Sequence, residues 1–230
     1  MWPSPSSRII EWIMCGLYRL SVTPAAVKAA FGLPEAPDFP PRGIIRPGEP
    51  VGVVRRAADG ARRWRLALWG LIPQWMKEPP KGRRIINARA ETLLERPSFR
   101  GLVRHRRCLF PADGFYEWTG ERGHKKAWLF ARPDGGVFAM AGLWDRWLGA
   151  DGSEVDTAVI ITVDANADVA AVHDRMPALL LDADAVRRWL DPAVPAREAM
   201  TLLKPAPGGS LKTLDAGNPL KRPPAQGRLL

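Results

Sequence analysis

The chain has 230 residues, a formal net charge of +10 and a hydrophobic content of 46%. That length suffices for one well-buried core, and the hydrophobic content is ordinary for a globular protein. No apolar stretch approaches the roughly 20 residues needed to span a bilayer, and Glu11 interrupts the only candidate for a secretory signal. We therefore expect one domain, no membrane contact and a monomer.

The first predicted elements are a helix and a β-hairpin. Thr23-Pro24 is typical of a helix start, and Gly32 is typical of its end. Alternating hydrophobic residues at 51–56 and 62–68, on either side of Asp59-Gly60, predict a hairpin.

The later segments predict more strands and a few short helices. Strands are expected at 108–118, 126–131, 137–148 and 154–163, with Asp134-Gly135 and Asp151-Gly152 joining the last three as hairpins. Short helices are expected at 90–95, 98–104, 184–190 and 196–203. Mostly antiparallel strands with short peripheral helices predict an α+β fold built on an antiparallel sheet or a barrel-like core.

The composition suggests three parts along the chain. Residues 1–13 form an N-terminal extension, residues 14–203 a single domain, and residues 204–230 a basic tail rich in Pro and Gly. That tail is expected to lie along the surface or to be mobile.

Basic residues concentrate in the middle of the chain. Between Lys81 and Arg107 there are nine basic residues and two acids. The chain also has ten tryptophans, and a basic groove with stacking aromatic rings is typical of single-strand binding. The sequence therefore favours a nucleic-acid partner over the alternative of a solvated basic face.

The two cysteines, Cys15 and Cys108, form no C-x-x-C pair. This usage fits a reducing cytoplasm and argues against a disulfide scaffold. Cys108 lies between apolar residues of a predicted strand and is expected to be an inert core thiol.

Cys15 follows Met14 directly and precedes Gly16. If translation starts at Met14, removal of that methionine leaves a cysteine whose α-amine and thiol belong to one residue. An α-amine has a pKa of about 8, so a useful fraction is free at neutral pH. Such a residue can attack an aldehyde through nitrogen and then sulfur, closing a thiazolidine ring. The alternative is a small buried hydrophobic residue.

Residues 1–14 would block this chemistry if they were retained. We consider a start codon assigned too early, a prefix removed by self-cleavage, and an extension that inhibits the protein, and we favour the first.

Five sequence blocks occur together in one order. They are Met14-Cys15-Gly16, Trp69–Pro73 with Trp75, Asn87–Thr92, Arg107–Trp118 and His173–Pro177. In this order they resemble the SRAP family, the SOS response-associated peptidases that act as abasic-site processing proteins.

The resemblance implies binding of single-stranded DNA that carries an abasic site, in a DNA damage response at the nucleoid. Cys15 would form a Schiff base with the C1′ aldehyde and then a thiazolidine, which joins protein to DNA. Asn87 would orient the amine and the sugar oxygen. Glu117 would move protons at the sugar, and His173 would serve as acid or base for the Schiff base.

The resemblance also implies contacts with DNA. The family usually has an arginine where this chain has Leu17, so Arg19 is expected to take over that contact. The other expected contacts are Arg89 and Arg175 as phosphate clamps. Trp69, Pro73 and Trp75 are expected either to form an apolar wedge against the bases or to belong to the core.

No cofactor is implied, and three histidines with two cysteines show no metal-ligand spacing. Two other functions stay open at this point. One is a cysteine peptidase, with Cys15 as nucleophile and His173 as base, whose only cleavage could be autoprocessing. The other is a single-strand-binding module without chemistry.

Overall fold

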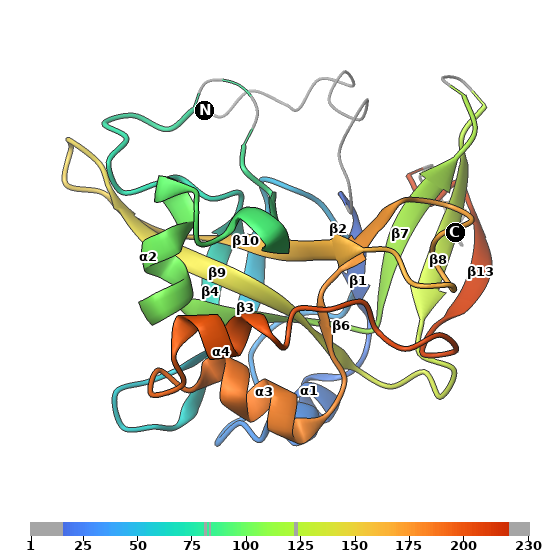
Figure 1. Cartoon of the computed structure of the whole chain (residues 1–230), viewed down its shortest axis with the longest axis horizontal. Helices are drawn as coiled ribbons and strands as arrows, with labels where there is room; N and C mark the ends of the chain where they lie inside the picture. The colour runs from blue at the N-terminus through green and yellow to red at the C-terminus, as the bar shows by residue number, and fades with distance from the viewer. Residues whose placement is uncertain (1–15, 81, 83, 122–123, 221–230) are drawn as a thin grey trace, which may run out of the picture.

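The computed structural model describes residues 16–80, 82, 84–121 and 124–220, and it contains two β-sheets flanked by short helices (Figure 1). Most strand pairs are antiparallel, so the predicted α+β fold is confirmed. No helix in these described ranges is long and apolar enough to cross a membrane.

The larger sheet contains eight strands. These are β3 (Pro50–Arg56), β4 (Arg62–Trp69), β5 (Asn87–Arg89), β6 (Arg107–Ala112), β9 (Phe138–Leu148), β10 (Glu154–Asp164), β11 (Arg175–Pro177) and β12 (Leu179–Leu180).

Five of these strands close into a barrel. Pairing runs from β10 to β4, β3, β6 and β9, and β9 pairs again with β10. The expectation of a barrel-like core is therefore confirmed. Strands β5 and β11 both pair with β10, and this arrangement positions the candidate site described below.

The smaller sheet has five strands in the order β13-β8-β7-β1-β2. They are β1 (Tyr18–Leu20), β2 (Arg42–Ile45), β7 (Gly114–Thr119), β8 (Lys126–Ala131) and β13 (Lys212–Gly217).

The chain passes from the larger to the smaller sheet at Asp113, between β6 and β7. The Asp113 carboxylate is buried and accepts hydrogen bonds from the Ser21 backbone N–H at 2.8 Å and the Ser21 hydroxyl at 2.6 Å. This tie to β1 breaks the predicted strand 108–118 into two strands that belong to different sheets.

Four α-helices and one short 3₁₀ helix lie in the described ranges. They are α1 (Pro24–Phe31), η1 (Ala90–Thr92), α2 (Pro97–His105), α3 (Ala183–Leu190) and α4 (Ala196–Met200). The caps predicted for α1 are present. The Thr23 hydroxyl accepts from the Ala26 N–H at 3.3 Å, and Gly32 adopts φ 59°, which favours glycine.

Two of the three hairpins are confirmed. β3 and β4 pair around Asp59-Gly60, and β9 and β10 pair around Asp151-Gly152. The hairpin predicted at Asp134-Gly135 is wrong. A turn forms there, but it carries the chain from β8 in the smaller sheet to β9 in the larger one. Local turn chemistry cannot report which sheet the next strand joins.

The segment predicted as a tail from residue 204 contributes a strand. β13 pairs with β8 from Lys212 to Gly217. The sequence did not predict this strand for two reasons. The segment is rich in Pro and Gly, and the strand lies at a sheet edge, where its side chains are mostly exposed. Residues 1–15 and 221–230 lie outside the described ranges.

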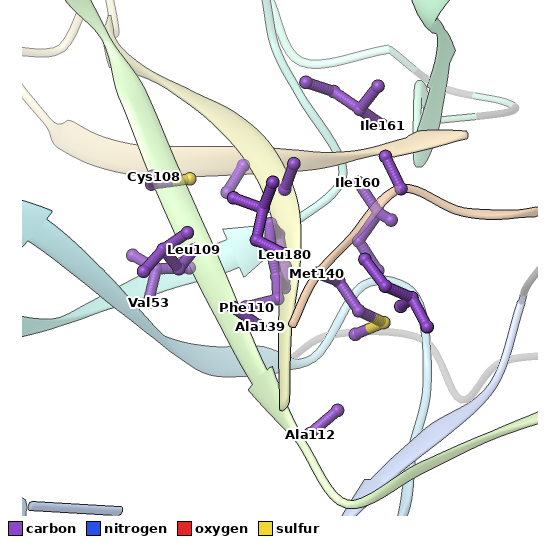
Figure 2. Close-up of a cluster of buried hydrophobic side chains, with 14 of the residues drawn as sticks. Val53, Cys108, Leu109, Phe110, Ala112, Ala139, Met140, Ile160, Ile161 and Leu180 are labelled. Atoms are coloured by element: carbon purple, nitrogen blue, oxygen red, sulfur yellow. The ribbon is translucent and has the colours of Figure 1, made fainter. Parts of the chain in front are cut away.

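Cys108 lies in a cluster of buried hydrophobic side chains from the barrel strands (Figure 2). The residue is fully buried and its thiol is free. Burial raises the pKa of this thiol far above its usual value. Its predicted place in the core is confirmed.

Candidate functional site

Strand β10 brings the Asn87 segment and the His173 segment together. β5 lies along one side of β10 in parallel, with Asn87 opposite Ile160 and Arg89 opposite Thr162. β11 lies along the other side, and Thr162 also faces Pro177. Asn87 is half-buried and Arg89 is exposed, so Arg89 remains available to a ligand.

An ion cluster joins these two segments. The Arg175 guanidinium donates to both carboxylate oxygens of Glu91 at 2.9 Å, to the Thr162 carbonyl at 2.7 Å and to Asp164. These hydrogen bonds hold the pKa of Glu91 below its usual value. The prediction of Arg175 as a phosphate clamp is wrong for this structure, because its side chain is buried and already bound to two carboxylates.

His173 lies two residues before the start of β11, and its ring is held by hydrogen bonding. The Arg175 backbone N–H donates to His173 Nδ1 at 3.0 Å, which fixes Nδ1 as the acceptor and puts the proton of the neutral ring on Nε2. An Asp174 carboxylate oxygen lies 3.0 Å from the same Nδ1.

Glu117 lies next to the start of the described chain. In the ladder between β1 and β7, Tyr18 faces Phe115, and the Tyr116 N–H donates to the Leu17 carbonyl at 2.9 Å. Continued by one residue, this register sets Glu117 opposite Gly16. Glu117 is 2% exposed, which is rare for a carboxylate. Cys15 itself lies outside the described residues.

Trp69 is a buried link between β1 and the Asn87 segment. Its ring packs edge-on against Tyr18 at 5.2 Å between centroids, and its Nε1–H donates to the Ile86 carbonyl at 3.0 Å. Trp69 is 0% exposed, so of its two expected roles the core role fits and the wedge against bases does not. Pro73 is buried too, and the predicted wedge reduces to Trp75.

Trp75 is 71% exposed, on a loop whose backbone is fixed. The Gln74 N–H donates to Asp145 at 3.3 Å, and the Trp147 indole donates to the Met76 carbonyl at 2.7 Å. Burial raises the pKa of Asp145 above its usual value. A solvent-facing ring on an anchored loop is the arrangement that a stacking platform needs.

Arg19 faces away from Glu117. Side chains alternate along β1, so Arg19 lies on the face of the smaller sheet that Leu17 and Tyr116 occupy. Its Nε lies 3.2 Å from the Asp113 carboxylate. Leu17 is buried in a small apolar cluster, and its position therefore offers no charge to a phosphate.

The contributions of Glu91, Tyr18 and Asp145 could not be found from the sequence. The Glu91–Arg175 pair spans 84 residues, and no local pattern reports such a contact. Among the described residues, no group of three or more His, Cys, Asp or Glu side chains is placed to hold a metal ion.

The sequence matches the family model of the SOS response associated peptidases (SRAP) over residues 14–220. The chain belongs to the SRAP family. The match begins at Met14 and extends through β13, beyond the predicted domain end at residue 203.

Similar proteins bear a common name. The abasic site processing protein YoqW of Bacillus subtilis is 37% identical over 161 residues, which are 70% of each chain. The abasic site processing protein HMCES of Gallus gallus is 37% identical over 178 residues, 66% of this chain and 53% of that protein. This chain thus spans about half the length of the chicken protein.

Solved structures share the fold. A protein from Bacteroides thetaiotaomicron has a TM-score of 0.79 at 28% identity, covering 87% of this chain and 91% of its own. A protein from Bordetella bronchiseptica has a TM-score of 0.77 at 26% identity, covering 89% and 100%.

Proposed function

We propose that this SRAP protein binds single-stranded DNA at an abasic site and attaches itself covalently through Cys15. The observation that carries the proposal is the register of β1 against β7. It sets the buried Glu117 opposite Gly16, one residue from Cys15. The names of the relatives in Bacillus subtilis and chicken supply the substrate class.

The reaction balances with the residues of this chain. The Cys15 amine adds to the C1′ aldehyde of the ring-opened sugar, and loss of one water gives the Schiff base. The Cys15 thiol then adds to the imine carbon while its proton passes to the nitrogen, which closes the thiazolidine. The net reaction joins one aldehyde and one cysteine and releases one water.

Three side chains have separate tasks in this proposal. Asn87 orients the amine and the sugar oxygen, since an amide both donates and accepts. Glu117 delivers the proton that the sugar oxygen needs when it leaves as a hydroxyl or as water. His173 moves protons at the imine, and a strand-cleaving elimination would begin there with removal of a C2′ proton.

Arg89 and Trp75 would hold the strand by phosphate contact and by base stacking. Both side chains are exposed, unlike Trp69 and Arg175. We propose a smaller contribution from Arg19, because Asp113 already compensates its charge.

The proposal requires a free amine at Cys15, so residues 1–14 must be absent from the active protein. We propose that the active chain starts at Met14 and loses that methionine. An amide nitrogen at Cys15 cannot attack an aldehyde. A chain that retains Met1 should therefore bind DNA without forming the adduct.

The test is incubation with abasic single-stranded DNA, followed by denaturing electrophoresis. A chain expressed from Met14 should give a heat-stable adduct, Cys15→Ala should give none, and Cys108→Ala should retain it because that thiol lies in the core. An adduct formed equally by an intact chain that retains Met1 would refute the mechanism.

The family description favours one second candidate, a peptidase with Cys15 as nucleophile. Mass spectrometry of the chain expressed from Met1 separates the two. Time-dependent release of residues 1–14 in the purified protein, lost in Cys15→Ala, would support autoprocessing.

A further inference from the structure

A groove of about 480 Å³ lies beside α2, against the segment that leads into α4. The volume falls in the usual range for ligand sites. Its walls combine apolar side chains with three basic ones. The lining residues are Leu94, Arg104, His105, Pro192, Val194, Pro195, Ala196 and Arg197.

The charged side chains that line the groove are all basic. Arg104 and Arg197 are exposed, and neither has a carboxylate within ion-pair distance among the residues that the structure describes. The lining contains no acid. The neighbouring acids have other partners, since Asp191 pairs with Arg56 at 2.8 Å and Glu198 hydrogen-bonds Arg188 at 2.8 Å.

The buried side chain of Arg107 holds one wall of the groove in place. Arg107 is buried and donates to the backbone carbonyls of Asp191 and of Val194, the latter at 3.1 Å. Its guanidinium also lies over the Trp189 ring, 5.7 Å from the centroid. The segment that carries Pro192 and Val194 is therefore held in place before any ligand arrives, which lowers the cost of binding.

The basic surface continues along α2. Arg100 and Arg104 are four residues apart on the exposed side of the helix, and Arg96 stands at its N-cap, another four residues earlier. Like charges at this spacing repel each other and destabilise a helix. The successive phosphates of a bound strand would offset this repulsion, because each arginine would then lie beside a negative charge.

We propose that this groove is a second binding site for single-stranded DNA, which takes phosphates at Arg104 and Arg197 and a base against Val194. The inference rests on the proposed function, because the strand bound near Arg89 supplies the DNA. Leu94 joins that region to the groove within one short segment of chain. Because the groove lies next to the proposed DNA site along the chain, we favour DNA as its ligand over an acidic peptide.

The experiment measures binding of a long oligonucleotide without abasic sites across a range of salt concentrations. The proteins are the full chain, Arg104→Ala, Arg197→Ala and the double variant. The control is Arg132→Ala, which removes an arginine directly after β8 of the smaller sheet, where Asp134 already compensates its charge at 2.6 Å. Alanine suits both helix positions, and thermal unfolding checks that the variants fold.

For single strands, log K falls with log salt by about 0.7 for each phosphate neutralised. The double variant should lower that slope by about 1.4, each single variant by about 0.7, and the control should leave it unchanged. An unchanged slope in the double variant overturns the proposal. So does a double variant that loses affinity for an oligoglutamate peptide while its DNA slope stays the same.

Crosslinking of the unaltered chain to abasic DNA is scored separately. A chain that binds plain DNA with the predicted slope changes but never crosslinks would overturn the proposed chemistry and leave the groove standing. A chain that crosslinks while the double variant keeps its slope would do the reverse. Failure of the unaltered chain to bind plain DNA overturns both.

Discussion

The carboxylate of Glu91 and the guanidinium of Arg175 form a two-point pair, with both oxygen–nitrogen distances at 2.9 Å. Glu91 follows the Asn87 strand within η1, and Arg175 opens β11 two residues after His173. The pair therefore ties together the two segments that carry Asn87 and His173. Arg175 acts on the proposed chemistry through position, because both terminal nitrogens of its guanidinium already donate to other groups.

Glu91→Gln should destabilise the protein by about 1 kcal/mol near neutral pH, less than for a buried pair, because Glu91 is half exposed. Since Arg175 lowers the pKa of Glu91 in the folded state, the stabilisation is present above the unfolded value of about 4.3. It is lost as pH falls through the lower folded value. Urea unfolding should show a larger difference between the two proteins at pH 7 than at pH 3. An equal difference at both values would contradict the ion pair.

Trp69→Phe should lower stability by roughly 1–3 kcal/mol, since it removes one of the two hydrogen bonds to the Ile86 carbonyl and shrinks the ring against Tyr18. The measurement is the free energy of unfolding. Trp69→Ala should cost about 3–5 kcal/mol by the same measurement.

Trp75→Ala is the counterpart of Trp69→Phe at an exposed ring. Its unfolding free energy should change by less than about 0.5 kcal/mol. If a base stacks on Trp75, affinity for single-stranded DNA should fall by about 1–3 kcal/mol, measured by fluorescence anisotropy. Unchanged affinity would remove Trp75 from the DNA path.

The contrast between these tryptophans marks what the sequence could and could not predict. Both lie in one motif, and the motif alone cannot report that Trp69 is buried against Tyr18 while Trp75 is exposed to solvent. The helix caps at Thr23 and Gly32 were predictable because capping is local. The crossing between sheets after Asp134-Gly135 was not, because it depends on pairing with distant strands.

The same distinction applies to the candidate site. Asn87, Glu117 and His173 were found as residues of ordered motifs, whereas their supports depend on contacts across the fold. Glu91 meets Arg175 over 84 residues, and Asp145 holds the Trp75 loop over 71 residues. Arg175 was assigned to DNA because a motif records residue type and order and cannot show which donors are already satisfied.

Asp145→Asn should change how stability depends on pH. Burial raises the folded-state pKa of Asp145, so its ionised form is disfavoured in the folded protein. Its contribution is fully present below the unfolded pKa of about 3.9 and is lost as pH rises through the folded value. The asparagine variant should therefore gain stability relative to the unaltered protein between about pH 4 and pH 7. Parallel stability curves over that interval would refute the assignment.

The last prediction separates Glu117 from His173. Glu117→Gln keeps shape and hydrogen bonding at a buried position but removes the carboxyl that we propose as the proton donor to the sugar oxygen. It should slow stable crosslinking by about 10²–10⁴-fold, the usual range for a general acid. His173→Ala should leave binding intact and mainly reduce crosslink reversal and strand cleavage, because the ring would move protons at the imine.

Asp174→Ala is the matched control for His173. It removes the carboxylate beside Nδ1 and keeps the backbone contact from Arg175 that orients the ring. We expect this variant to reverse crosslinks more slowly than the unaltered protein but faster than His173→Ala. Crosslink formation, reversal and strand cleavage are measured separately for each variant across pH. Equal losses in all three rates for Glu117→Gln and His173→Ala would show that the two residues do not divide the proton transfers.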